Sequence, residues 1–181
     1  MDDALWSRLE AHQIGPADAP LGFAARLARE NRWSEDFAQA VIGEYKRFCY
    51  LAMTAGHPVT PSDQVDQAWH LHLSYSRDYW RRFCPEVLGQ ELHHGPTSGS
   101  EEDRARFFED YAQTLKAYEA IWGPPPEDIW SPAAERFGRQ TRGFRTFPDR
   151  VIFLKDRAGI ASLLFMMFVL LGMGFALGKL L

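Results

Sequence analysis

The sequence predicts an all-α protein, a compact helical domain followed by a single C-terminal transmembrane helix. Apolar side chains recur at helical spacing through most of the first 130 residues, and no run alternates as a strand would. Residues 158–177 read AGIASLLFMMFVLLGMGFAL without a single charge. A helix needs about 20 apolar residues to cross a bilayer. We therefore expect a domain over residues 1–130, a juxtamembrane linker over 131–157 and a transmembrane helix over 158–179.

Three helices are expected before residue 58. The first is a short helix within residues 1–14, and the second covers residues 21–31. Ser34 is a typical N-cap for the third helix, which ends where Gly56 and Pro58 prevent its continuation. The side chains expected to face the core are Leu5, Trp6, Leu9, Phe23, Leu27, Phe37, Val41, Tyr45 and Phe48.

Two further helices are expected between residues 60 and 88. Thr60 should cap the first of them, with Pro61 at its first helical position. Ser76 should begin the second, over residues 77–87, and Pro85 should make its last turn irregular. The inward-facing candidates are Val65, Trp69, Leu73, Tyr79, Trp80 and Phe83.

The last predicted helix of the domain follows a loop over residues 89–99. Ser100 caps it, and Gly123 followed by three prolines ends it. One face is aromatic over its length. Beyond Trp130, the mixture of Gly, Pro and Arg with isolated aromatic residues suits a linker along a membrane surface, and it suits a loosely packed extension of the domain equally well.

The residues that flank the apolar run predict its orientation. Arg150, Lys155 and Arg157 precede it, and only Lys179 follows. The positive-inside rule therefore places the N-terminal domain in the cytoplasm, and the protein is expected as a single-pass protein of the cell membrane, with the lipid bilayer as its first partner. The acidic start of the chain lacks the features of a secretory signal.

Within the predicted transmembrane helix, Gly174 and Gly178 lie four residues apart. This spacing is typical of surfaces on which two membrane helices approach closely. It permits a weak homodimer through these glycines.

The charge balance and the two cysteines bear on which partners and which chemistry the protein can have. Without Lys179, 19 of the 20 basic residues stand against 24 acidic residues, which argues against a nucleic-acid partner. Cys49 and Cys84 do not belong to a CxxC pair, so we expect buried, unreactive thiols in a cytoplasmic domain.

Four of the six histidines fall between positions 70 and 94. Asp66 and His70 are four residues apart on one helix face, where a carboxylate and an imidazole can share an ion or bind each other. His70 and His72 point about 200° apart on an α-helix, so one of them must serve another role. The candidate metal ligands are Asp66, His70, His72, Cys84, His93 and His94.

Two main interpretations of this cluster stay open, beside a third, His/Asp acid–base catalysis without a metal, for which no nucleophile is recognisable. In one, Asp66, His70 and one or both loop histidines hold zinc, with Cys84 in reserve, since zinc accepts N, O and S ligands. In the other, His70 donates a hydrogen bond to Asp66, while the loop histidines cap helix ends or stack on tryptophan rings.

The chain resembles the glycine-rich domain-containing proteins. The resemblance rests on residues 65–73 (VDQAWHLHL), 92–96 (LHHGP) and 125–130 (PPEDIW), and it covers residues 37–130. It implies that the candidate ligands belong to a family motif, together with Trp69, Tyr79 and Pro96. The chain has 14 glycines and no glycine-rich tail, and the resemblance implies no activity.

Two functions are compatible with these features. The sequence favours an interaction or scaffolding module that binds a protein partner at the membrane, because no recognisable nucleophile or phosphate-binding glycine loop is present. The alternative is a zinc-dependent enzyme, most naturally a hydrolase, in which Asp66 and the histidines hold the metal and an acidic residue activates water.

Overall fold

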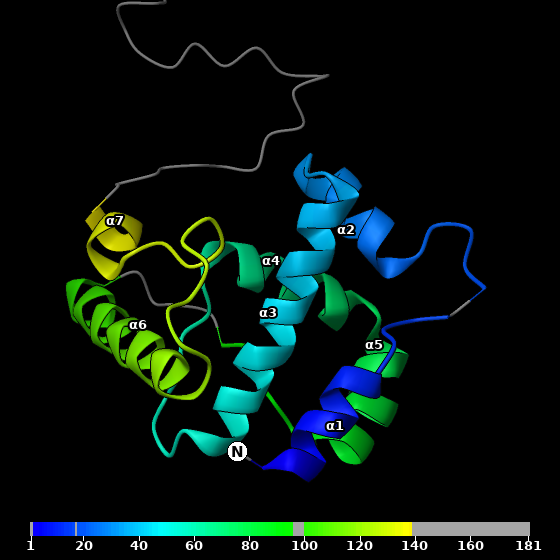
Figure 1. Ribbon diagram of the computed structural model, residues 1–181, viewed down its shortest axis with the longest axis horizontal. Coiled ribbons are helices and arrows are strands. Elements are labelled where there is room, and N and C mark those ends of the chain that lie inside the picture. The colour runs from blue at the N-terminus through cyan, green and yellow to red at the C-terminus, as the bar shows by residue number, and fades with distance from the viewer. Residues whose placement is uncertain (1, 17, 96–99, 139–181) are drawn as a thin grey trace, which may run out of the picture. The chain divides into compact units, whose positions relative to one another are not determined.

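The computed structural model describes residues 2–16, 18–95 and 100–138, and every regular element in this part of the chain is a helix (Figure 1). The prediction of an all-α domain is confirmed. The first compact unit runs from Met1 to Gln140. In chain order its helices are α1 (Asp3–Ala11), α2 (Phe23–Asn31), α3 (Glu35–Thr54), α4 (Asp63–Ser74), α5 (Ser76–Asp78), the π-helix η1 (Tyr79–Leu88), α6 (Glu101–Trp122) and α7 (Ala133–Gly138).

Helix α3 is the centre of the domain. It packs against α1, α2, α4 and α6, and Figure 1 shows it between α6 and α7 on one side and α1 and α5 on the other. Its side chains Val41, Tyr45 and Phe48 recur at helical spacing and are almost completely buried. A helix buried against several neighbours can carry inward-facing polar groups. Tyr45 carries such a group, a hydroxyl that contacts the ring of His72.

Serine caps fix where three of the helices begin. The side chains of Ser34, Ser62 and Ser100 each accept a hydrogen bond from the backbone N–H three residues later. The expectation that Thr60 caps α4 is therefore wrong, because Ser62 takes this role. The backbone N–H of Thr60 instead donates to Oγ1 of Thr114, 3.0 Å away, and so ties the segment before α4 to α6.

The helix expected over residues 77–87 has a different geometry. After the single turn of α5, the chain forms the wider π-helix η1, which contains Pro85. Proline has no N–H to donate and would disrupt an α-helix at this point. The π-helix ends at Leu88, and Gly89 caps it with a φ of 80° and donates its N–H to the carbonyl of Cys84.

One residue of this π-helix that was predicted to lie in the core is exposed instead. Tyr79 and Phe83 are buried as expected, but the Trp80 side chain is 39% exposed. Side chains of a π-helix follow a different angular spacing from those of an α-helix, so the expected inward position of Trp80 was wrong.

The segment after α6 folds back onto the domain. Trp130 is almost completely buried, and its Nε1 donates to Oε2 of Glu44 over 2.9 Å. Residues 131–138, which the sequence assigns to the linker, include α7, whose Arg136 lies 4.6 Å from the centre of the Tyr111 ring.

The predicted transmembrane helix over residues 158–179, with Gly174 and Gly178, lies outside the described residues. Within the part of the chain that is described, no helix is both long and apolar enough to cross a membrane.

Two tryptophans offer a matched test of the core. Trp69 is buried against Phe48, with ring centres 5.2 Å apart, so Trp69→Ala should lower the free energy of unfolding by about 3–5 kcal/mol. Trp80→Ala, at an exposed ring of the same type, should lower it by less than about 1 kcal/mol. Urea titration of both variants measures the difference, and equal losses would contradict this assignment of the core.

Candidate functional site

Helix α4 presents its histidines to two different environments. His72 is completely buried, whereas the side chain of His70 is 53% exposed. The two residues therefore belong to separate groups. We call His12, His72 and Asp78 the inner cluster, and Asp66, His70 and His94 the outer cluster; in each, one ligand atom per residue lies within 4.8 Å of the others.

The inner cluster is a continuous hydrogen-bonded chain. Oδ2 of Asp78 lies 2.9 Å from Nε2 of His72 and 3.1 Å from Nε2 of His12. An ionised carboxylate only accepts, so both Nε2 atoms carry the proton. Nδ1 of His72 is then an acceptor, and the Tyr45 hydroxyl donates to it over 2.9 Å. The second carboxylate oxygen of Asp78 accepts from Arg82 over 2.9 Å.

The surroundings of the inner cluster decide its charge. Burial lowers the pKa of His12 and His72, and this effect outweighs the attraction of the Asp78 carboxylate. Burial alone would raise the pKa of Asp78, but the hydrogen bonds that His72 and His12 donate to its carboxylate, and their electrostatic interaction with it, lower the pKa overall. At neutral pH the cluster therefore holds an ionised carboxylate between two neutral imidazoles, with Arg82 as the counter-charge.

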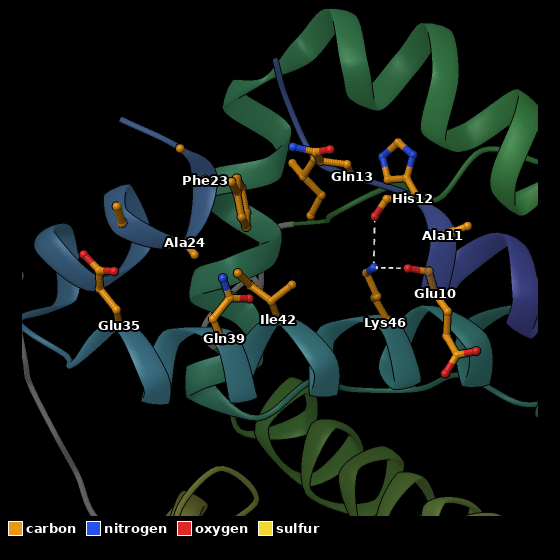
Figure 2. A pocket seen from close by; sticks show the side chains of 13 residues that line it. Glu10, Ala11, His12, Gln13, Phe23, Ala24, Glu35, Gln39, Ile42 and Lys46 are labelled. Carbon is orange, nitrogen blue, oxygen red and sulfur yellow. Dashed lines mark hydrogen bonds between the residues drawn. The ribbon is translucent and has the colours of Figure 1, made fainter. Parts of the chain in front are cut away.

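Sequence reasoning missed His12 and Asp78 as partners of His72. His12 lies directly after α1, far from α4 in the chain, and no local pattern connects them. Its position is fixed by Lys46 of α3, whose Nζ donates to the backbone carbonyls of Glu10 and His12, each over 2.9 Å (Figure 2). These contacts form one wall of a pocket of about 470 Å³ between α1, α2 and α3.

The outer cluster lies at the surface where α4 meets the loop after η1. Oδ1 of Asp66 is 2.9 Å from Nε2 of His94, and Oδ2 of Asp66 is 3.4 Å from Nε2 of His70. The centres of the two imidazole rings are 4.3 Å apart. Asp66 and His94 are each only about a quarter exposed, so His70 is the side of the cluster that is open to solvent.

A chain of contacts from the core positions His94. Nε1 of Trp69 donates to the Tyr79 hydroxyl over 2.9 Å, and this hydroxyl donates to the carbonyl of Leu92. The Trp69 and His94 rings meet edge to face with centres 4.6 Å apart. The loop therefore bends back to α4 because Tyr79 holds its backbone.

The structure separates the other predicted ligands from the outer cluster. His72 belongs to the inner cluster, and the thiol of Cys84 is buried, which raises its pKa. Nε2 of His93 lies 2.8 Å from a carboxylate oxygen of Glu91, and its ring is tilted against Trp80 with ring centres 5.4 Å apart. Pro96 lies outside the described residues.

These features define an all-helical domain with one buried and one exposed histidine–carboxylate cluster. Residues 14–107 match the family described as UCP032817-like, which is more than half of the chain, and the chain belongs to this family. The resemblance to glycine-rich domain-containing proteins was therefore a wrong assignment. The comparisons with curated proteins and with solved structures find no match.

The inner cluster predicts that acid destabilises the domain. Both histidines have a pKa below the ordinary 6.5, so below about pH 6.5 the unfolded chain binds more protons than the folded one. Their contribution to stability is complete above this pH and is lost as pH falls toward their folded pKa values. The lowered pKa of Asp78 adds a further loss below its ordinary 3.8.

Urea titrations between pH 8 and pH 5 measure this dependence. His72→Asn removes one of the two buried histidines that titrate in this range. The free energy of unfolding of this variant should be lower than that of the wild type, but it should change less with pH. His57→Ala, at a partly buried position outside both clusters, is the control and should retain the wild-type dependence. Wild-type stability that rises between pH 7 and pH 5 would contradict the assignment of neutral buried histidines.

Proposed function

We propose that this protein is a membrane-anchored interaction or scaffolding module, with its helical domain at the cytoplasmic face of the cell membrane. The observation that carries the proposal is the uncharged run over residues 158–177, which follows a separate compact unit ending at Gln140. The basic residues just before this run support the cytoplasmic orientation.

The polar groups inside the domain support a structural rather than a reactive interior. Glu44 is bonded to Trp130 and Arg47, and the inner cluster is closed by Tyr45 and Arg82. The thiol of Cys49 is fully buried, which raises its pKa and makes it a poor nucleophile. A rigid body of this kind suits the presentation of a surface to another protein.

Exposed apolar side chains offer contacts for a protein partner. Trp80 of η1 and Phe108 and Ile121 of α6 are each about 40% exposed. Aromatic anchors of this type are enriched among the residues that contribute most to binding between proteins. We place the partner in the cytoplasm or in the membrane beside the anchor.

A zinc-dependent hydrolase is the second candidate function. The specific observation in its favour is the solvent-facing side of the outer cluster, since catalytic zinc sites combine three protein ligands with an open position. The interaction module ranks first because it requires only an anchor and a surface, whereas the hydrolase requires an activated water and a substrate site in addition to a bound metal.

Membrane anchoring is tested by placing charge in the apolar run. Phe168→Arg together with Leu171→Arg should release the protein from carbonate-washed membranes, because each central arginine costs about 2.5–3.5 kcal/mol on insertion. Phe144→Arg, which adds the same charge before the run, should leave the protein in the membrane fraction. Equal fractionation of all three proteins would contradict the anchor.

Orientation and partner binding need separate measurements. Protease added to intact spheroplasts should leave the domain uncut, and digestion would overturn the cytoplasmic orientation. A photocrosslinker at Trp80 or Phe108 should give a discrete protein adduct that depends on the anchor. The absence of any adduct from both positions would overturn the use of these two side chains in an interaction.

A further inference from the structure

We infer that the outer cluster is a surface site for a divalent transition-metal ion, with zinc as the ion it suits best and Asp66, His70 and His94 as the protein ligands. The inference does not depend on membrane anchoring or on a protein partner. It concerns a site that the fold assembles from α4 and from the loop after η1.

The spacing of the ligand atoms fits a tetrahedral ion. Zinc binds imidazole nitrogen and carboxylate oxygen at about 2.0–2.2 Å, so two ligand atoms in a tetrahedral site lie roughly 3.3–3.5 Å apart. The two contacts of Asp66 measure 3.4 Å from Oδ2 to Nε2 of His70 and 2.9 Å from Oδ1 to Nε2 of His94. One ligand atom from each of the three residues lies within 4.8 Å of the others, so modest side-chain rotations would bring the three atoms around one ion.

The identity of the ligands selects the class of metal. Two imidazoles and one carboxylate suit zinc and its neighbours among the transition metals, whereas magnesium and calcium prefer oxygen ligands throughout. The fourth coordination position faces solvent, because His70 is the most exposed member of the cluster. A water molecule would complete the site.

Hydrogen bonding accounts for the inner cluster but only partly for the outer one. In the inner cluster each contact has hydrogen-bond length, and Tyr45 and Arg82 occupy the remaining groups of His72 and Asp78. In the outer cluster the 3.4 Å contact between Asp66 and His70 exceeds ordinary hydrogen-bond length. At this separation the carboxylate of Asp66 and the imidazole of His70 can both bind one ion.

The site is also held in place before any ion arrives. Asp66 and His70 lie one turn apart on α4, so the helix fixes their separation. His94 is fixed by its contact with Trp69 and by the hydrogen bond from Tyr79 to the backbone of Leu92. Outer contacts of this kind commonly orient metal ligands.

Zinc titration of the full-length protein in detergent, after removal of metal with a chelator, tests the inference. Isothermal titration calorimetry should give one zinc ion per chain, and Co²⁺ should give the visible absorption of a tetrahedral site. His70→Ala and Asp66→Asn each remove a ligand at the surface and should weaken zinc binding by more than about 100-fold. Unchanged circular dichroism will show that the fold is retained.

His93→Ala is the matched control, since it removes the histidine next to His94 that lies instead against Trp80 and Glu91. It should bind zinc as the wild type does. Tyr79→Phe keeps all three ligands but releases the loop, so its affinity should fall about 10–100-fold. The inference is overturned if the wild type binds no stoichiometric zinc, or if His93→Ala loses binding that His70→Ala retains.

Discussion

The carboxylate of Asp78 is the group on which the arrangement of the domain depends. A buried charge is strongly unfavourable unless it is paired and hydrogen-bonded, and the partners of this one come from three different helical segments. His12 follows α1, His72 belongs to α4 and Arg82 belongs to η1, while Tyr45 of α3 holds the far side of His72. These hydrogen bonds form together, and stabilise the fold, only when the helices are packed in this arrangement. The apolar core supplies the driving force, and the carboxylate network selects the packing.

Tyr79 links this interior network to the surface. Its ring packs edge to face on His72 with ring centres 5.0 Å apart, and its hydroxyl accepts from Trp69 and donates to Leu92. Tyr79 therefore connects the inner cluster to the loop that carries His94. Helix α4 supplies the buried His72 to the inner cluster and the exposed His70 to the outer cluster. A domain built in this way can keep a rigid surface site without placing its ligands on a flexible loop alone.

The proposed anchor and the proposed metal site address different questions about the protein. The anchor concerns where the domain works, and it rests on the composition of a segment outside the described residues. The metal site concerns what the surface binds, and it rests on the geometry of three side chains. The residues that match the UCP032817-like family span α2 to η1 and the start of α6. They include the whole outer cluster but not His12.

The sequence by itself determined the all-α class, most helix boundaries and the pairing of Asp66 with His70, because helical periodicity, caps and four-residue spacing are local properties. It also showed that His70 and His72 must point apart. It could not place Trp80, because the π-helix around Pro85 changes the angular spacing of its side chains. Only the tertiary structure decided that His12 and Asp78 join His72 and that His94, not His93, reaches Asp66. Those choices depend on contacts between segments distant in the chain, above all the hydrogen bonds from Lys46 to the end of α1 and from Tyr79 to Leu92, which no local pattern specifies.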